Sequence, residues 1–265
     1  MKNFIKTVFS KRYSHDSSFH FPKIADIEPT KKSSPSPYSF FIDERNPLRE
    51  LGEVYAPTKR HHNYLPYYWM HFRDVRYQVK TFCEIGVQTD KSLRMWEDFF
   101  PNAIIYGIDI DLNCKKFEGG RRRIMIGDQS DPRFLSDVMR QIGTGLDIVI
   151  DDGSHHPSHQ VASFDILFPQ LSDHGIYAIE DTGGCVGDSD LKTINAFKRI
   201  VDHIMFWPKG LDPSSWPSLT EFPPYASWAD RNLIGVAFYR WLVFAFRGLN
   251  PGDNNNLLKQ AQRFP

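Results

Sequence analysis

From residue 51 onward, apolar runs of strand length alternate with amphipathic stretches of helix length. This alternation is typical of α/β proteins, in which helical crossovers join the parallel strands of one sheet. Five runs have the length and apolar content of buried strands, namely 81–85, 104–108, 123–126, 147–150 and 176–179. The stretches between them predict helices at 91–100, 132–142, 158–171 and 188 to about 201. We therefore expect a Rossmann-like α/β fold with helices on both faces of the sheet.

Two further apolar runs, 234–238 and 242–246, are separated by Tyr239-Arg240-Trp241. They predict an antiparallel hairpin that closes one edge and completes a mostly parallel seven-stranded sheet. In the helix expected at 158–171, Val161, Phe164, Leu167, Phe168 and Leu171 form one apolar stripe. The sequence Asp173-His174-Gly175 is expected to stop that helix.

Composition narrows the class of protein. Lys plus Arg and Asp plus Glu both total 32, so no overall charge indicates a nucleic-acid partner. The three cysteines, Cys83, Cys114 and Cys185, are too few and too scattered for a disulfide framework, which favours a reducing compartment such as the cytoplasm. Cys83 lies in an apolar run and is expected to be a small buried hydrophobe. No apolar run approaches the length of about 20 residues that spans a bilayer.

The flanks divide the chain into an irregular N-terminal arm (1–50), a main domain (51–250) and a tail (251–265). Residues 1–12 are basic, with apolar residues at helical spacing, so membrane-surface contact is one alternative, beside docking on the protein and disorder. The segment 206–232 is rich in Pro and aromatic residues. It is expected either to cover a substrate as a lid or to pack against the core or a second subunit, so a homo-oligomer stays open.

Acidic residues or glycine follow nearly every expected parallel strand: Gly86, Asp109, Asp128, Asp151-Asp152 and Glu180-Asp181. In parallel sheets, ligands bind at the carboxyl ends of the strands. A single Asp after a strand is usually a turn residue. Five consecutive strand ends of this kind predict a ligand site.

The first three strand ends suit a small nucleoside-like cofactor. Gly86 allows close approach of a ligand, while the absence of Gly-x-Gly-x-x-Gly disfavours a pyrophosphate. Asp109 is positioned to accept ribose hydroxyls. Asp128 or Gln129 could contact a base, with a turn or helix cap as the equally weighted alternative for Asp128.

The last two strand ends suit a hard cation. Asp152 lies 28 residues before Glu180, one crossover away, and Asp181 follows directly. Three carboxylates brought together need a cation or shared protons, and oxygen ligands favour Mg²⁺ or another hard divalent ion. Turn capping by Asp152 and Asp181 is the alternative. His155 is the favoured general base because it lies three residues after Asp152, with His156 and His159 as competitors.

These motifs resemble the metal-dependent sugar O-methyltransferases of macrolide antibiotic biosynthesis, of the mycinamicin and macrocin type. The resemblance covers roughly residues 51–250. It is carried by Glu84-Ile85-Gly86-Val87, Ser92-Leu93-Arg94-Met95-Trp96, Phe99-Phe100-Pro101, Ile105-Tyr106-Gly107-Ile108-Asp109, the run from Asp147 through His155, and Glu180-Asp181-Thr182.

The resemblance implies a class I methyltransferase fold and Mg²⁺-dependent methyl transfer from S-adenosylmethionine (SAM) to a hydroxyl of a sugar or glycosylated small molecule. The roles it implies are SAM binding by Glu84, Gly86, Ser92, Asp109, Asp128 and Gln129, metal ligation by Asp152, Glu180 and Asp181, and a base at His155. Asp151 is assigned to the cofactor side. The segment 55–64 resembles one that closes over the cofactor, and a polar loop leading into a helix is the alternative.

Two departures limit the transfer of function. Gln88-Thr89-Asp90 replaces the expected glycine-rich continuation, and only about 50 irregular residues stand where some relatives have an auxiliary domain. The macrolide substrate and the relatives' assembly are therefore not carried over. Two other hypotheses remain: a hydroxylase-like activity on the same fold, and a scaffold protein that has lost activity. The intact acidic residues disfavour the scaffold.

Overall fold

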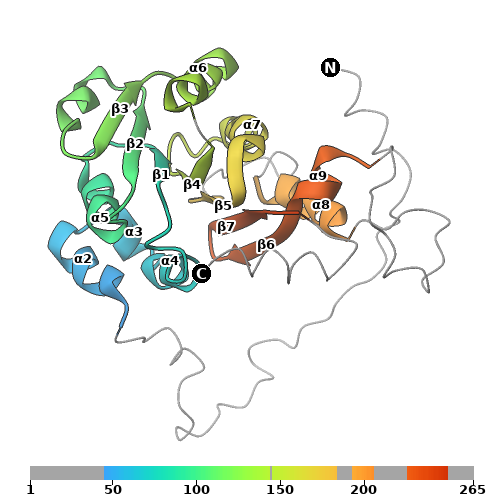
Figure 1. Ribbon diagram of the computed structural model, residues 1–265, viewed down its shortest axis with the longest axis horizontal. Coiled ribbons are helices and arrows are strands. Elements are labelled where there is room, and N and C mark those ends of the chain that lie inside the picture. Colours follow the sequence, from blue (N-terminus) through green and yellow to red (C-terminus); the bar gives the residue numbers. More distant parts are fainter. Residues whose placement is uncertain (1–44, 144, 184–192, 206–225, 250–265) are drawn as a thin grey trace, which may run out of the picture. The chain divides into compact units, whose positions relative to one another are not determined.

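The computed structural model describes residues 45–143, 145–183, 193–205 and 226–249. Its centre is a seven-stranded sheet with the order β3-β2-β1-β4-β5-β7-β6 (Figure 1). The strands are β1 (Thr81–Ile85), β2 (Ile104–Asp109), β3 (Arg122–Ile126), β4 (Leu146–Asp151), β5 (Leu171–Ile179), β6 (Leu233–Tyr239) and β7 (Leu242–Arg247). The first five pair in parallel, whereas β7 pairs antiparallel with both β5 and β6. The expected sheet and C-terminal hairpin are confirmed.

Both faces of the sheet are apolar because its strands are covered on both sides. On one face, Phe82, Ile148, Ile150 and Phe244 pack against three helices, α2 (Pro47–Tyr55), α4 (Leu65–Phe72) and α5 (Lys91–Phe99). Figure 1 shows these helices grouped with the short α3 (Thr58–His61). On the other face, alternate strand residues pack against α6 (Pro132–Ile142), α7 (Pro157–Leu167) and α8 (Thr193–Ile204). Cys83 lies on this second face, fully buried as expected.

Local signals explain where α6 begins and ends. The Asp131 side chain accepts a hydrogen bond from the Arg133 amide, Pro132 occupies the first turn, and Gly143 ends the helix in a left-handed conformation. These are the residue types that start and stop helices. The helix has the bounds expected from the sequence.

The boundary between α7 and β5 differs from expectation. We expected the helix to reach residue 171 and Asp173-His174-Gly175 to stop it, but α7 ends at Leu167 and a short 3-10 helix, η4 (Phe168–Gln170), follows. Pro169 disfavours a further α-helical turn at the residue before it. Leu171 then begins β5 and pairs with Leu146, so Asp173 and His174 lie within a strand.

Three regions hold short elements that the sequence did not indicate. These are the connection between β2 and β3, the region before β1 and the segment before β6. A 3-10 helix, η3 (Leu112–Phe117), joins β2 to β3. Helix α2 begins at Pro47, inside the range expected to be irregular, where the Asn46 side chain accepts from the Leu48 amide. The short α9 (Trp228–Asn232) precedes β6. No helix in the described part of the chain is both long and apolar enough to cross a bilayer.

Candidate active site

A cavity of about 730 Å³ lies at the carboxyl ends of the parallel strands. This is the position and size typical of cofactor sites in such sheets. Eight of the residues singled out from the sequence line it: Gly86, Ser92, Asp109, Asp128, Gln129, Asp152, His155 and Asp181. Three others, Glu84, Asp151 and Glu180, are buried and lie outside this lining.

Gly86 lines the cavity at the turn between β1 and α5. Its φ of +97° is a left-handed conformation, and a Cβ there would lie 2.0 Å from the backbone oxygen of Asp152. The Asp152 amide also donates to the Ile85 carbonyl at 2.9 Å. The glycine therefore lets the chain's own Asp152–Gly153 backbone approach the end of β1, in addition to opening the cavity to a ligand.

Asp109 braces the same turn. Its Oδ2 accepts from the amides of Val87 (2.8 Å) and Gln88 (3.0 Å), and its Oδ1 accepts from the Asp111 amide (2.8 Å). Burial acts to raise the pKa of Asp109, but these backbone hydrogen bonds outweigh it, and the pKa is lowered. The carboxylate is thus ionised at the cavity wall while it fixes the β1–α5 turn.

Gln129 holds the loop that follows β4. Its Nε2 donates to both oxygens of Asp151 (3.1 and 3.2 Å) and to Ser163 Oγ (3.1 Å), and its Oε1 accepts from the Ser154 amide (2.7 Å). Burial raises the pKa of Asp151 to about 6. Gln129 and Asp151 therefore act on the loop that carries Asp152 and His155. Asp128 accepts from the Ser130 amide at 2.8 Å, the turn contact expected as its alternative role.

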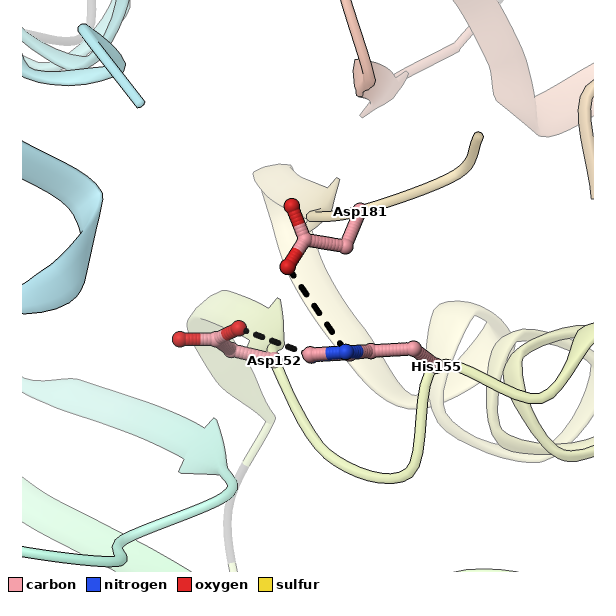
Figure 2. A group of neighbouring side chains, drawn as sticks. All are labelled: Asp152, His155 and Asp181. Carbon is pink, nitrogen blue, oxygen red and sulfur yellow. Dashed lines mark hydrogen bonds and ion pairs between the residues drawn. The ribbon is translucent and has the colours of Figure 1, made fainter. Parts of the chain in front are cut away.

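Asp152, His155 and Asp181 form a cluster of neighbouring side chains (Figure 2). All three line the cavity. His155 Nε2 lies 3.1 Å from Asp152 Oδ1, and its Nδ1 lies 3.6 Å from Asp181 Oδ2. One ligating atom from each of the three residues falls within 4.8 Å of the others. The hydrogen bond to Asp152, followed by the charges of the nearby carboxylates, raises the pKa of His155. We call these three residues the outer cluster.

Glu180 belongs to a second cluster, buried behind the first. Ligating oxygens of Glu84, Asp152 and Glu180 lie within 4.8 Å of one another. The structure thus divides the three carboxylates that the sequence grouped: Asp152 is shared, Asp181 is in the outer cluster and Glu180 is not. We call Glu84, Asp152 and Glu180 the inner cluster.

Lys59 lies at the centre of the inner cluster. Its Nζ is 3.0 Å from Glu84 Oε1, 2.8 Å from Asp152 Oδ2 and 2.9 Å from Glu180 Oε1, and its side chain is fully buried. Burial alone would lower the pKa of Lys59, but the attraction of the three carboxylates raises it well above the ordinary value. The ammonium group therefore remains charged inside the protein.

Two tyrosines close to Lys59 in the chain also donate to carboxylates of the two clusters. Tyr64 donates to Asp181 Oδ1 at 2.7 Å, and Tyr68 donates to Glu180 Oε1 at 2.6 Å. His62 Nδ1 also lies 3.3 Å from Asp181 Oδ1. Residues 57–72, which contain α3 and α4, thus reach all four carboxylates of the outer and inner clusters. We call residues 57–72 the strap.

Sequence reasoning missed Lys59, Tyr64 and Tyr68. A lysine in a polar segment gives no signal of burial, because its partners come from strands far along the chain. The tyrosines had a detectable pattern, since Tyr64, Tyr68 and Phe72 recur every four residues on one helical face. The resemblance at 55–64 had pointed to the strap without identifying these residues.

Most of the expected lid lies outside the described residues. Of the segment 206–232, the structure describes 226–232, where Trp228 packs edge-on against Phe168 and lies 5.6 Å from the Arg247 guanidinium. The arm up to residue 44, Cys185 and the tail are likewise outside the described ranges.

The strand order, the antiparallel β7 and the cavity at the carboxyl ends define a class I methyltransferase domain. No family model matches the chain. Mycinamicin VI 2''-O-methyltransferase of Micromonospora griseorubida is 36% identical over 222 residues, which cover 77% of this chain and 53% of that protein. Demethylmacrocin O-methyltransferase of Streptomyces fradiae is 34% identical over 222 residues, with the same coverage of 77% and 53%.

A solved structure supports the same relationship. The MycE methyltransferase from the mycinamycin pathway, in complex with Mg and SAH, superimposes with a TM-score of 0.66 at 32% identity, over 81% of this chain and 60% of that one. The domain is related to the sugar O-methyltransferases of antibiotic biosynthesis, as its motifs indicated. The chain spans about half the length of the curated relatives it matches.

Proposed function

We propose that this protein transfers a methyl group from SAM to a hydroxyl of a sugar or glycosylated small molecule, with the help of Mg²⁺ or a similar divalent ion. The observation that carries the proposal is the outer cluster in the lining of a cavity large enough for a cofactor. The named relatives methylate glycosylated natural products, and the related MycE structure contains Mg and SAH. Both agree with the chemistry of the cavity.

The residues present fit a hard cation. Asp152 and Asp181 offer carboxylate oxygens on the cavity side, with the His155 ring between them. Carboxylates are the ligands that Mg²⁺ and Mn²⁺ prefer. In this proposal Asp152 and Asp181 hold the ion from the cavity side. Glu180, the third carboxylate expected from the sequence, lies on the buried side, where Lys59 and Tyr68 bind its Oε1.

The residues also fit SAM. The cavity is lined by Gly86 and Ser92 at the β1–α5 turn, by Asp109 after β2 and by Asp128 after β3. The helix N-terminus at α5 can receive a carboxylate, and acidic side chains after β2 suit ribose hydroxyls. Gln129 and Asp151 support this wall through the loop after β4, and Glu84 accepts from Ser92 Oγ at 2.7 Å beneath it.

When bound, SAM supplies an electrophilic methyl group and the divalent ion favours loss of the acceptor's proton. His155 is proposed as the base that takes this proton. Its ring lies between Asp152 Oδ1 and Asp181 Oδ2, so a protonated imidazole is stabilised on both sides. The neighbouring loop is held by Gln129, which keeps the ring at the cavity.

The experiment is a screen of glycans and nucleotide sugars for transfer of labelled methyl from SAM. We expect transfer that chelation abolishes, and about a 10²-fold or greater loss in Asp152→Asn, the range for a lost electrostatic group at a reacting centre. Asp137→Asn, at an exposed position on α6, is the control and should retain full activity. Full activity in excess EDTA would contradict the metal requirement.

Calorimetry with SAM alone, together with the methyl-transfer screen, separates the proposal from the other two hypotheses. A hydroxylase-like protein on this fold would show no SAM binding at millimolar concentration, and the proposal would then be wrong. A scaffold that has lost activity would bind SAM or metal without turnover of any acceptor in the screen. Binding followed by methyl transfer supports the methyltransferase.

A further inference from the structure

The inner cluster has the geometry of a cation site, and its cation is part of the chain. Three acidic side chains from different strand ends, those of Glu84, Asp152 and Glu180, converge within 4.8 Å. The Lys59 ammonium lies within 2.8–3.0 Å of an oxygen of each. Carboxylates gathered in this way need a compensating cation, and here a covalently attached ammonium provides it.

The two clusters share one carboxylate. Asp152 directs Oδ2 to Lys59 and Oδ1 to the side of His155 and Asp181. A carboxylate that bridges two cation positions is the arrangement found in two-metal sites, whose ions lie about 4 Å apart. In this protein one of the two positions is occupied by a lysine.

We infer that Lys59 is the resident inner cation of the active site, and that it restricts the site to a single divalent ion in the outer cluster. The inference rests on the proposed function for the outer ion, but its core concerns the inner cluster alone. Lys59 is a positioning residue in this role. It holds Glu84, Asp152 and Glu180 in place whether or not a metal is bound.

The strap fixes Lys59 in this position. The backbone carbonyl of Lys59 accepts from the Tyr64 amide at 3.0 Å, and the Lys59 side chain is fully enclosed. Tyr68, one helix further along, donates to Glu180 Oε1, the same oxygen that Lys59 contacts. An enclosed ammonium cannot be removed by a chelator or exchanged for another ion, in contrast to a second metal.

The test compares metal binding by the full chain and by Lys59→Met, which keeps the length and apolar stem of the side chain but removes its charge. Isothermal titration with Mn²⁺ alone should show that Lys59→Met binds one ion more per chain than the wild type. The added Glu180→Gln substitution should remove that extra ion. Lys80→Met, at an exposed position before β1, should leave the count unchanged.

The difference in count decides the inference. An equal number of Mn²⁺ ions in the folded wild type and in Lys59→Met overturns it, because a vacated inner cluster would then attract no metal. The wild-type count is a separate result. A wild type that binds no Mn²⁺ contradicts the metal of the proposed function, yet one ion gained in Lys59→Met would still support the inner-cation role.

Removal of Lys59 leaves buried carboxylates uncompensated, so the variant can lose its fold in metal-free buffer. Refolding of Lys59→Met with and without Mn²⁺, followed by circular dichroism, covers that case. The inference requires Mn²⁺ to take the place of the ammonium and restore the fold. A variant that stays unfolded with Mn²⁺ overturns the inference as clearly as an unchanged count does.

Discussion

At the scale of single residues, His155 is distinguished from its neighbours by what surrounds its ring. It lies between Asp152 and Asp181 at the cavity, whereas His156 is exposed and bonds to Ser158 Oγ at 2.9 Å. His159 lines the cavity but bonds to Ser154 Oγ at 2.9 Å. Only the first environment stabilises an imidazolium with two carboxylates.

This contrast gives a kinetic prediction. His155→Gln should lower kcat by about 10²- to 10⁴-fold, the usual contribution of a general base, while the SAM dissociation constant stays the same. Steady-state kinetics and calorimetry on the same preparation measure both quantities. His156→Gln is the matched control and should be fully active. If His159→Gln showed the large loss in kcat and His155→Gln did not, the assignment of the base would be wrong.

The positions of several site residues could be inferred from the sequence because parallel strands end at one edge. That rule located Asp152, His155 and Asp181 at a common cavity. It could not locate Lys59, whose role depends on the strap packing across three strand ends. It also could not show that Gln129 turns its amide toward the chain's own loop, since that orientation depends on Ser154 and Ser163.

At the scale of elements, the β1–α5 turn and the loop after β4 are built against each other. Gly86 is the point of contact, because only a residue without Cβ leaves room for the Asp152 carbonyl. Gly143, at the end of α6, has a similar left-handed φ of +73°, but a Cβ there would meet nothing within 4 Å. A comparison of substitutions at the two glycines therefore separates the cost of backbone strain from the cost of a steric clash.

Alanine substitution at these two positions should have unequal effects. Gly143→Ala should cost about 1–2 kcal/mol of unfolding free energy, the strain of a left-handed alanine. Gly86→Ala adds a backbone clash and should cost about 3 kcal/mol more, with loss of SAM binding. Urea denaturation and calorimetry with SAM measure the two effects. Equal costs at both positions would show that the turn and the loop can move apart.

The ends of an element could be predicted where capping residues in the local sequence determine them. They could not be predicted where pairing with a distant strand determines them. Asp131, Pro132 and Gly143 fix α6 by themselves, and its bounds followed from the sequence. Leu171 fits both the apolar stripe of a helix and the start of a strand. Its pairing with Leu146 selects the strand, and that contact is not visible in local periodicity.

At the scale of the whole molecule, α4 is attached to the C-terminal hairpin through a half-buried histidine. His71 Nε2 lies 2.9 Å from the Tyr239 hydroxyl, and its ring packs 4.4 Å from Phe244 and 5.0 Å from Phe246. Burial lowers the pKa of His71 from 6.5 to about 4. The folded protein therefore holds this ring neutral where an unfolded chain would protonate it.

The neutral His71 ring makes the folded protein sensitive to acid. Below pH 6.5 the unfolded state binds a proton at His71 that the folded state does not, so His71 makes stability fall as the pH decreases from about 6.5 to about 4. His71→Phe should flatten this part of the profile. Urea unfolding of both proteins at several pH values is the measurement, with His174→Phe on β5 as a control. An unchanged slope in His71→Phe would show that other groups cause the loss.

The C-terminal hairpin has a consequence for how the protein is made. Every acidic residue of the site is synthesised by residue 181, but the outer edge of β5 gains its partner only when β7 (Leu242–Arg247) emerges from the ribosome. The hairpin turn also holds the end of β5, where the Thr182 amide donates to the Trp241 carbonyl at 3.1 Å. Until then the nascent chain presents an unpaired apolar strand edge beside the carboxylates of the two clusters, a surface suited to chaperone binding during translation.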